Sequence, residues 1–118
     1  MKVLIVDDNQ DITGLLSKFL KAKGFENVVT NDPWDGLERI KEEKYDVVLL
    51  DISMPEFSGI DIIQQLEREK ILKVQKIVIF SATAFTTSQV NDLLKKDGIK
   101  GCLKKPIQLH ELLTAITS

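Results

Sequence analysis

The sequence predicts an α/β fold in which a five-stranded parallel sheet is covered by helices on both faces. Five short apolar runs alternate with segments whose apolar residues recur at helical spacing. The clearest runs are continuously apolar, which is typical of strands buried on both faces of a parallel sheet. Because crossovers between parallel strands are right-handed, few topologies remain, and we expect the doubly wound strand order 2-1-3-4-5.

The expected strands are the five apolar runs at residues 2–6, 27–30, 46–50, 76–80 and 101–103. Helical spacing predicts five helices, one after each strand. Asp32 followed by Pro33 is typical of a helix start, and Gly24 and Gly98 are the expected stops of the first and fourth helices. In the fourth helix, Val90, Leu93 and Leu94 are expected to face inward.

Length and composition favour one soluble domain spanning residues 1–118. The net charge of −2 gives no broad basic surface for nucleic acid. Cys102 is the single cysteine, which excludes an internal disulfide and a cysteine-cluster zinc site. No apolar run approaches the ~18 residues of a membrane span, so we expect a cytoplasmic protein without membrane insertion. Whether the chain is complete or cut from a longer protein stays open.

Polar residues directly follow four of the expected strands. The carboxyl ends of parallel strands share one edge of the sheet, where ligands bind at the topological switch point. In the order 2-1-3-4-5 the first and third strands are neighbours, so the acids that follow them should converge. The residues are Asp7 and Asp8, Asp51, Ser81, and Lys104, Lys105 and Pro106.

Three converging carboxylates repel one another unless a cation joins them. A hard divalent cation with oxygen ligands is expected, Mg²⁺ first and Mn²⁺ as an alternative. Such a site would let Asp51 act as a nucleophile toward phosphorus, with a lysine and a hydroxyl binding the other oxygens. An isolated Asp after a strand is usually a turn residue or a helix cap. The conjunction of four strand ends therefore carries this prediction.

These residues resemble the motifs of the receiver domains of two-component response regulators, a family with a flavodoxin-like fold that includes the chemotaxis regulators. The resemblance covers the whole chain. Its matching pieces are Val-Asp-Asp at 6–8, Asp-Ile-Ser-Met-Pro at 51–55 with Gly59, Phe-Ser-Ala at 80–82 and Lys-Pro at 105–106.

The resemblance implies a magnesium site and a phosphoryl acceptor. Asp51 would accept the phosphoryl group and would also bind Mg²⁺. Asp8 would bind the metal directly, Asp7 mostly through water, and the backbone carbonyl of Ser53 would complete the protein ligands.

The resemblance also implies partners for the phosphoryl oxygens. Lys105 would bind one oxygen, and the hydroxyl of Ser81 would bind another. Lys104 should face the other way along the strand and be solvated. Pro106 would follow a cis peptide bond.

The implied function is a phosphorylation-dependent signalling switch. A histidine kinase or phosphotransfer protein, or a small donor such as acetyl phosphate, would supply the phosphoryl group. The receiver would catalyse its own phosphorylation and dephosphorylation and would not turn over external substrates. Its shift in conformation would control a partner protein or a C-terminal effector domain. The implied output surface consists of the fourth helix, the fifth strand and the fifth helix. A phosphorylation-dependent dimer through this surface is one of the implied assemblies.

The sequence departs from the family at one position. Many members have Tyr or Phe three residues before the lysine, where this chain has Cys102. In the family this aromatic side chain changes rotamer when the hydroxyl, here that of Ser81, moves onto the phosphoryl group. Cys102 is too small to respond in this way, and Phe80 or Phe85 is the alternative candidate for the role. Thr83 and Ser53 should flank the path of the attacking water.

The sequence also gives expectations for three further side chains and leaves two other functions as alternatives. Cys102 is expected to be a small buried residue, His110 a surface residue and Trp34 a partly exposed one. A phosphatase with an aspartyl-phosphate intermediate would need a second acid two residues after Asp51, where this chain has Ser53. A pseudo-receiver that only binds a partner is the other alternative, and the complete set of acids, hydroxyl and lysine argues against it.

Overall fold

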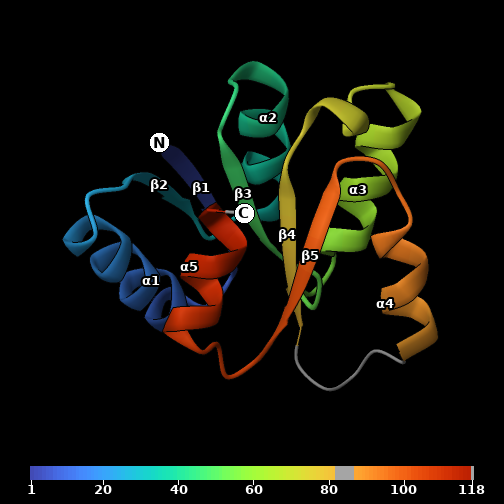
Figure 1. Ribbon diagram of the computed structural model, residues 1–118. Helices are drawn as coiled ribbons and strands as arrows, with labels where there is room; N and C mark the ends of the chain where they lie inside the picture. The colour runs from blue at the N-terminus through green and yellow to red at the C-terminus, as the bar shows by residue number, and fades with distance from the viewer. Residues whose placement is uncertain (82–86, 118) are drawn as a thin grey trace.

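The computed structural model describes residues 1–81 and 87–117 and shows a parallel five-stranded sheet in the order β2-β1-β3-β4-β5 (Figure 1). This confirms the predicted strand order. The strands are β1 (Lys2–Val6), β2 (Glu26–Thr30), β3 (Val47–Asp51), β4 (Ile77–Ser81) and β5 (Ile99–Lys104).

Helices cover both faces of the sheet, as expected. Helices α1 and α5 lie on one face, and α2, α3 and α4 lie on the other (Figure 1). Their bounds are α1 (Gln10–Ala22), α2 (Pro33–Glu42), α3 (Gly59–Arg68), α4 (Thr87–Leu94) and α5 (Leu109–Thr117), with a short 3₁₀ helix η1 (Leu72–Val74) before β4. None of the helices in the described parts of the chain combines the length and apolar character that a membrane span needs.

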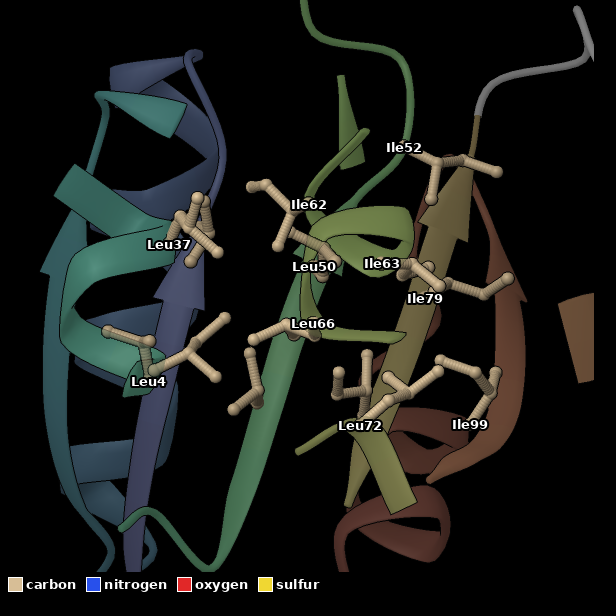
Figure 2. Packing of buried hydrophobic residues seen from close by; sticks show 14 of the residues in the cluster. Leu4, Leu37, Leu50, Ile52, Ile62, Ile63, Leu66, Leu72, Ile79 and Ile99 are labelled. Atoms are coloured by element: carbon tan, nitrogen blue, oxygen red, sulfur yellow. The ribbon is translucent and has the colours of Figure 1, made fainter. Parts of the chain in front are cut away.

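The core consists of two apolar clusters, one on each face of the sheet. Val48 and Leu50 of β3 belong to the cluster under α2, α3 and α4, whereas Val47 and Leu49 belong to the cluster under α1 and α5. Figure 2 shows the first cluster, in which strand residues such as Leu50 lie against α3. Alternate side chains of one strand thus enter two different cores, which explains why these runs are continuously apolar.

Several predicted boundaries were wrong by one or more residues. Asp51 and Ser81 are the last residues of β3 and β4, because Asp51 still pairs with Phe80 and Ser81 still pairs with Lys104. β5 begins at Ile99, two residues before the predicted start. Its apolar signal is weak because it is an edge strand with exposed positions.

The fourth helix also differs from the expectation. It ends at Leu94, four residues before Gly98. Gly98 has φ +100° and lies next to the carbonyl group of Leu72, so it forms the tight turn into β5. Leu93 is buried as expected, but Leu94 is 37% exposed, so its predicted inward orientation was wrong.

Two predicted helix signals are confirmed, and the structure adds an N-terminal cap that was not predicted. The Asp32 side chain accepts a hydrogen bond from the backbone N–H of Trp34, and Pro33 is the first residue of α2. Gly24 has φ +85° just after α1, which confirms it as a stop. Asn9 caps α1 by accepting hydrogen bonds from the backbone N–H groups of residues 11 and 12.

Helix α3 begins with a capping box and a close packed glycine. The Ser58 side chain accepts from the backbone N–H of Asp61, whose carboxylate accepts from the backbone N–H of Ser58. A Cβ at Gly59 would meet the carbonyl oxygen of Asp51 and would lie 2.8 Å from Cα of Ile52. The missing side chain therefore lets α3 pack directly on the end of β3.

Replacing Gly59 by alanine should destabilise the protein, because backbone atoms of β3 cannot move aside easily. We expect Gly59→Ala to lower the free energy of unfolding by about 1–3 kcal/mol. Gly14→Ala is the matched control, since a Cβ at Gly14 in α1 meets no described atom within 4 Å. That change should raise stability by about 0.5–1 kcal/mol. Urea denaturation at equilibrium measures both, and equal effects would contradict the packing role of Gly59.

Candidate phosphoryl-acceptor and metal site

Three carboxylates meet at the carboxyl edge of the sheet, where sequence reasoning placed them. Val6 of β1 pairs with Leu50 of β3, so the residues that follow them, Asp7 and Asp51, lie side by side. Carboxylate oxygens of Asp7, Asp8 and Asp51 all lie within 4.8 Å of one another. Asp7 and Asp51 are buried, and Asp8 is exposed. This arrangement could hold one small cation.

Lys105 joins the two buried carboxylates. Its Nζ lies 3.1 Å from Oδ2 of Asp7 and 3.2 Å from Oδ2 of Asp51. The backbone N–H of Lys105 donates to the carbonyl of Ser81, which places this lysine just beyond β5. Lys104 is exposed, as expected from strand alternation, and the peptide bond between Lys105 and Pro106 is cis, as predicted. The lysine predicted for the site is therefore the one that reaches it.

Burial shifts the protonation of Asp7. Its Oδ1 accepts a hydrogen bond from the backbone N–H of Asn9, whereas its buried Oδ2 forms an ion pair with Nζ of Lys105. Loss of solvent raises the pKa of Asp7 to about 7, and the nearby charge of Asp51 adds to this, although Asn9 and Lys105 oppose it. Near neutral pH this carboxyl is therefore poised between its two forms, and a cation would favour the ionised one.

Lys105 stays charged in this setting. Burial lowers the pKa of its ammonium group, but the negative charges of Asp51 and Asp7 outweigh burial and raise it overall. The site thus has a fixed positive charge next to Asp51. An incoming phosphoryl group, which brings negative charge, would find this ammonium at the right place.

Asp51 is oriented by its own loop. The backbone N–H of Ser53 donates to Oδ1 of Asp51 at 2.9 Å, and Nζ of Lys105 donates to Oδ2. The hydroxyl of Ser53 is buried and has no hydrogen-bond partner in the described part of the chain. This hydroxyl and Oδ2 of Asp7, which is paired with Nζ of Lys105, add to the oxygen atoms at this edge. Oxygen-rich surroundings of this kind fit Mg²⁺, which prefers carboxylates and water.

The structure brings Ser81 to the same edge, one residue beyond the strand partner of Asp51. Ser81 is 5% exposed and pairs with Lys104 of β5, two residues after Cys102. Burial raises the pKa of the Cys102 thiol, which is half-buried and therefore more exposed than expected. Phe80 is fully buried, under Nζ of Lys105. Thr83 and Phe85 lie outside the described residues.

Sequence reasoning missed two asparagines that support the acids. Asn9 holds Oδ1 of Asp7, and its place before a helix is the usual signal of a cap. Asn31 donates from its side chain to the backbone carbonyl of Asp7 and to Oγ1 of Thr13. No sequence pattern indicates that second contact. Exposed His110 on α5 takes no part in the site, as expected.

Comparison with known proteins identifies the family. The family model of the response regulator receiver domain matches residues 3–117, and the chain belongs to this family. The polar-differentiation response regulator DivK of Brucella anthropi is 28% identical over 116 residues, which are 98% of this chain and 93% of DivK.

Solved structures agree. The Francisella response regulator 1452 receiver domain has a TM-score of 0.84 at 28% identity and covers 98% of this chain, which covers 93% of it. Vibrio cholerae chemotaxis protein CheY4 has a TM-score of 0.83 at 26% identity, with coverage of 98% and 95%. The predicted flavodoxin-like receiver fold is confirmed, and the family implies phosphorylation-dependent two-component signalling.

The raised pKa of Asp7 predicts how stability depends on pH in metal-free protein. Folded Asp7 keeps its proton up to about pH 7, whereas the unfolded carboxyl loses it near 3.8. Between these values the folded state binds more protons, so this group lowers the free energy of unfolding as pH rises to about 7. The free energy of unfolding of Asp7→Asn, relative to that of the unmodified protein, should therefore be higher at pH 8 than at pH 5.

Urea denaturation in EDTA at both pH values checks this expectation. Asp92→Asn removes an exposed carboxylate on α4 and serves as the control. If both variants gave the same difference between pH 5 and pH 8, the burial effect at Asp7 would be refuted.

Proposed function

We propose that this receiver domain accepts a phosphoryl group on Asp51 with the help of Mg²⁺ and signals by shifting its conformation. The observation that supports this most is the contact of Nζ of Lys105 with Oδ2 of both Asp51 and Asp7 inside a buried cluster of acids. A carboxylate that is buried, oriented and next to a fixed cation is suited to attack phosphorus.

Asp8, Asp51 and the carbonyl of Ser53 would hold the metal directly, and Asp7 would act mostly through water. The cluster of three carboxylates fits this role, because their oxygens already lie within 4.8 Å of one another. Bound Mg²⁺ would offset negative charge on the phosphoryl oxygens during transfer. Ionisation of Asp7 would strengthen metal binding as pH rises through about 7.

Transfer requires position more than acid–base chemistry. An oxygen of Asp51 forms a bond to phosphorus while the bond from phosphorus to the donor breaks, and the donor leaves with the electron pair. The donor is a phosphohistidine of a kinase or phosphotransfer protein, or acetyl phosphate. Lys105 then pairs with a phosphoryl oxygen, and the Ser53 N–H holds the attacking carboxylate in line.

Hydrolysis resets the switch at the same site. Water attacks phosphorus, the bond from phosphorus to Asp51 breaks, and the carboxylate and inorganic phosphate are released. Between these events the hydroxyl of Ser81, which is buried at the same edge, would turn toward the phosphoryl group. That exchange would favour the active conformation over the inactive one, which is a population shift. The phosphorylated state then controls a partner protein, an effector domain or a dimer through α4, β5 and α5.

The donor protein would approach over α1 and the loop after β5. An apolar hollow of about 190 Å³ lies there beside Lys105, and Leu15 on α1 is 60% exposed at its rim. The lining residues are Ile12, Leu15, Leu16, Lys105, Pro106, Ile107 and Leu109. Apolar surface next to a reactive carboxylate fits a protein donor that must be held while its phosphohistidine reaches Asp51.

Phosphorylation at Asp51 is tested with acetyl phosphate and Mg²⁺. The unmodified chain should gain one phosphoryl group by intact-mass spectrometry, and Asp51→Asn should gain none. Asp46→Asn is the matched control, because Asp46 lies just before the other end of the same strand and is exposed. It should be phosphorylated normally. An adduct that persists in Asp51→Asn, or one that forms equally well in EDTA, would count against the proposal.

The two adjacent lysines give a second test. Lys105→Ala should slow phosphorylation by acetyl phosphate by at least about ten-fold, because a positioned charge at the transferring oxygens is lost. Lys104→Ala should leave the rate unchanged, because Lys104 is exposed on β5. Single-turnover kinetics followed by intact mass measures both rates. Equal rates in the two variants would remove Lys105 from the mechanism.

A further inference from the structure

We propose that the connection from β2 to α2, residues 30–35, positions both acid-bearing loops of the site although it supplies no ligand itself. Asn31 and Trp34 are its positioning residues. The inference rests on the proposed magnesium site, and it assigns a role to two side chains that the phosphoryl-transfer chemistry does not use.

Asn31 holds the loop that bears Asp7 and Asp8. Its Nδ2 donates to the backbone carbonyl of Asp7 at 2.8 Å and to Oγ1 of Thr13 at 3.0 Å. Thr13 is a buried residue of the first turns of α1. The amide of Asn31 therefore ties the peptide between the two aspartates to the helix that follows them.

The backbone of the same connection adds a further bond to that loop. The backbone N–H of Asp7 donates to the carbonyl of Thr30 at 3.2 Å. Asp7 is thus bound on both sides of its Cα by residues 30 and 31, and its carboxylate is held separately by Asn9. Rotation of the Asp7–Asp8 peptide, which would swing Asp8 away from Asp51, would break the Asn31 bond.

Trp34 holds the other acid-bearing loop, between β3 and α3. Its ring stacks on that of Phe57, with centroids 4.9 Å apart and an interplanar angle of 15°. Phe57 in turn packs against the core cluster under α2 and α3. The loop between Ser53 and Phe57 includes Glu56 at φ +66°, a conformation that needs support in a residue other than glycine.

The connection is itself well fixed, so it can support both loops. Asp32 caps α2 through the N–H of Trp34, which sets the direction of the ring. Two residues later α2 packs on the sheet where Gly36 meets Val6, whose side chain would lie 2.7 Å from an added Cβ. A rigid element bonded to two loops keeps the metal ligands of both loops at a constant distance. Residues that contact metal ligands without binding the metal commonly have this role.

Two asparagines on the same strand region allow a matched test of the first loop. Asn31→Ala should weaken Mg²⁺ binding about ten-fold, in the range that loss of such outer contacts costs. Asn27→Ala removes a similar link between β2 and α1, since Asn27 bonds with Ser17 at the far end of the strand. It should lower the free energy of unfolding but leave the Mg²⁺ dissociation constant unchanged. Magnesium titration followed by backbone amide NMR shifts gives the dissociation constants, and urea denaturation gives stability.

Trp34 is tested by a pair of substitutions in the same titration. Trp34→Ala should weaken Mg²⁺ binding by about three-fold or more, and Trp34→Phe should restore most of it, because a phenyl ring can still stack on Phe57. Amide hydrogen exchange in metal-free protein adds a readout without Mg²⁺. Exchange should increase at Asp7–Asn9 in Asn31→Ala and at Ser53–Phe57 in Trp34→Ala.

The outcomes separate the two proposals. If the unmodified chain did not bind Mg²⁺, the proposed function would fail and the positioning role with it. If the unmodified chain bound Mg²⁺ and Asn31→Ala matched Asn27→Ala in affinity, only the positioning role would be overturned. Equal Mg²⁺ affinity of the Trp34 variants and the unmodified chain would remove the second half of the inference.

Discussion

Burial of negative charge at one edge of the sheet governs the rest of this structure. Asp7 and Asp51 are almost completely withdrawn from water, and the described cation that faces both is Lys105. A buried charge is costly unless it is paired and hydrogen-bonded. The contacts of Asn9, Ser53 and Lys105 with the two carboxylates meet part of that demand. The remaining excess of negative charge makes the edge receptive to a cation.

The parallel sheet makes this concentration of charge tolerable. Strands with both faces buried form a rigid interior, which fixes the strand ends from which the acids extend. Movement is then restricted to the connections at the carboxyl edge. In a receiver domain of this kind, the sheet and its two apolar clusters stay fixed, and a small group of residues at the carboxyl edge responds to phosphorylation.

The sequence predicted the sheet and its acidic cluster better than the side-chain contacts that hold the acid-bearing loops. Buried runs, the acids at strand ends and the lysine before Pro106 have local signatures, so the strand order and the members of the cluster could be inferred. Strand ends were less certain, because an exposed edge strand such as β5 has a weak apolar pattern. The bonds of Asn31 and the stack of Trp34 on Phe57 join segments distant in sequence through single side chains. Such contacts have no periodicity, so only the structure reveals them.

The start of α3 has a mechanical consequence. Ser58 and Asp61 satisfy each other's backbone donors, so the first turn of the helix does not depend on the loop before it. Gly59 rests directly on the end of β3. Rearrangement of the loop from Ser53 to Phe57 can therefore stop at Ser58 without unwinding α3. The capping box thus limits unwinding at the start of α3, and the loop reaches the apolar core through the side chains of Met54 and Phe57.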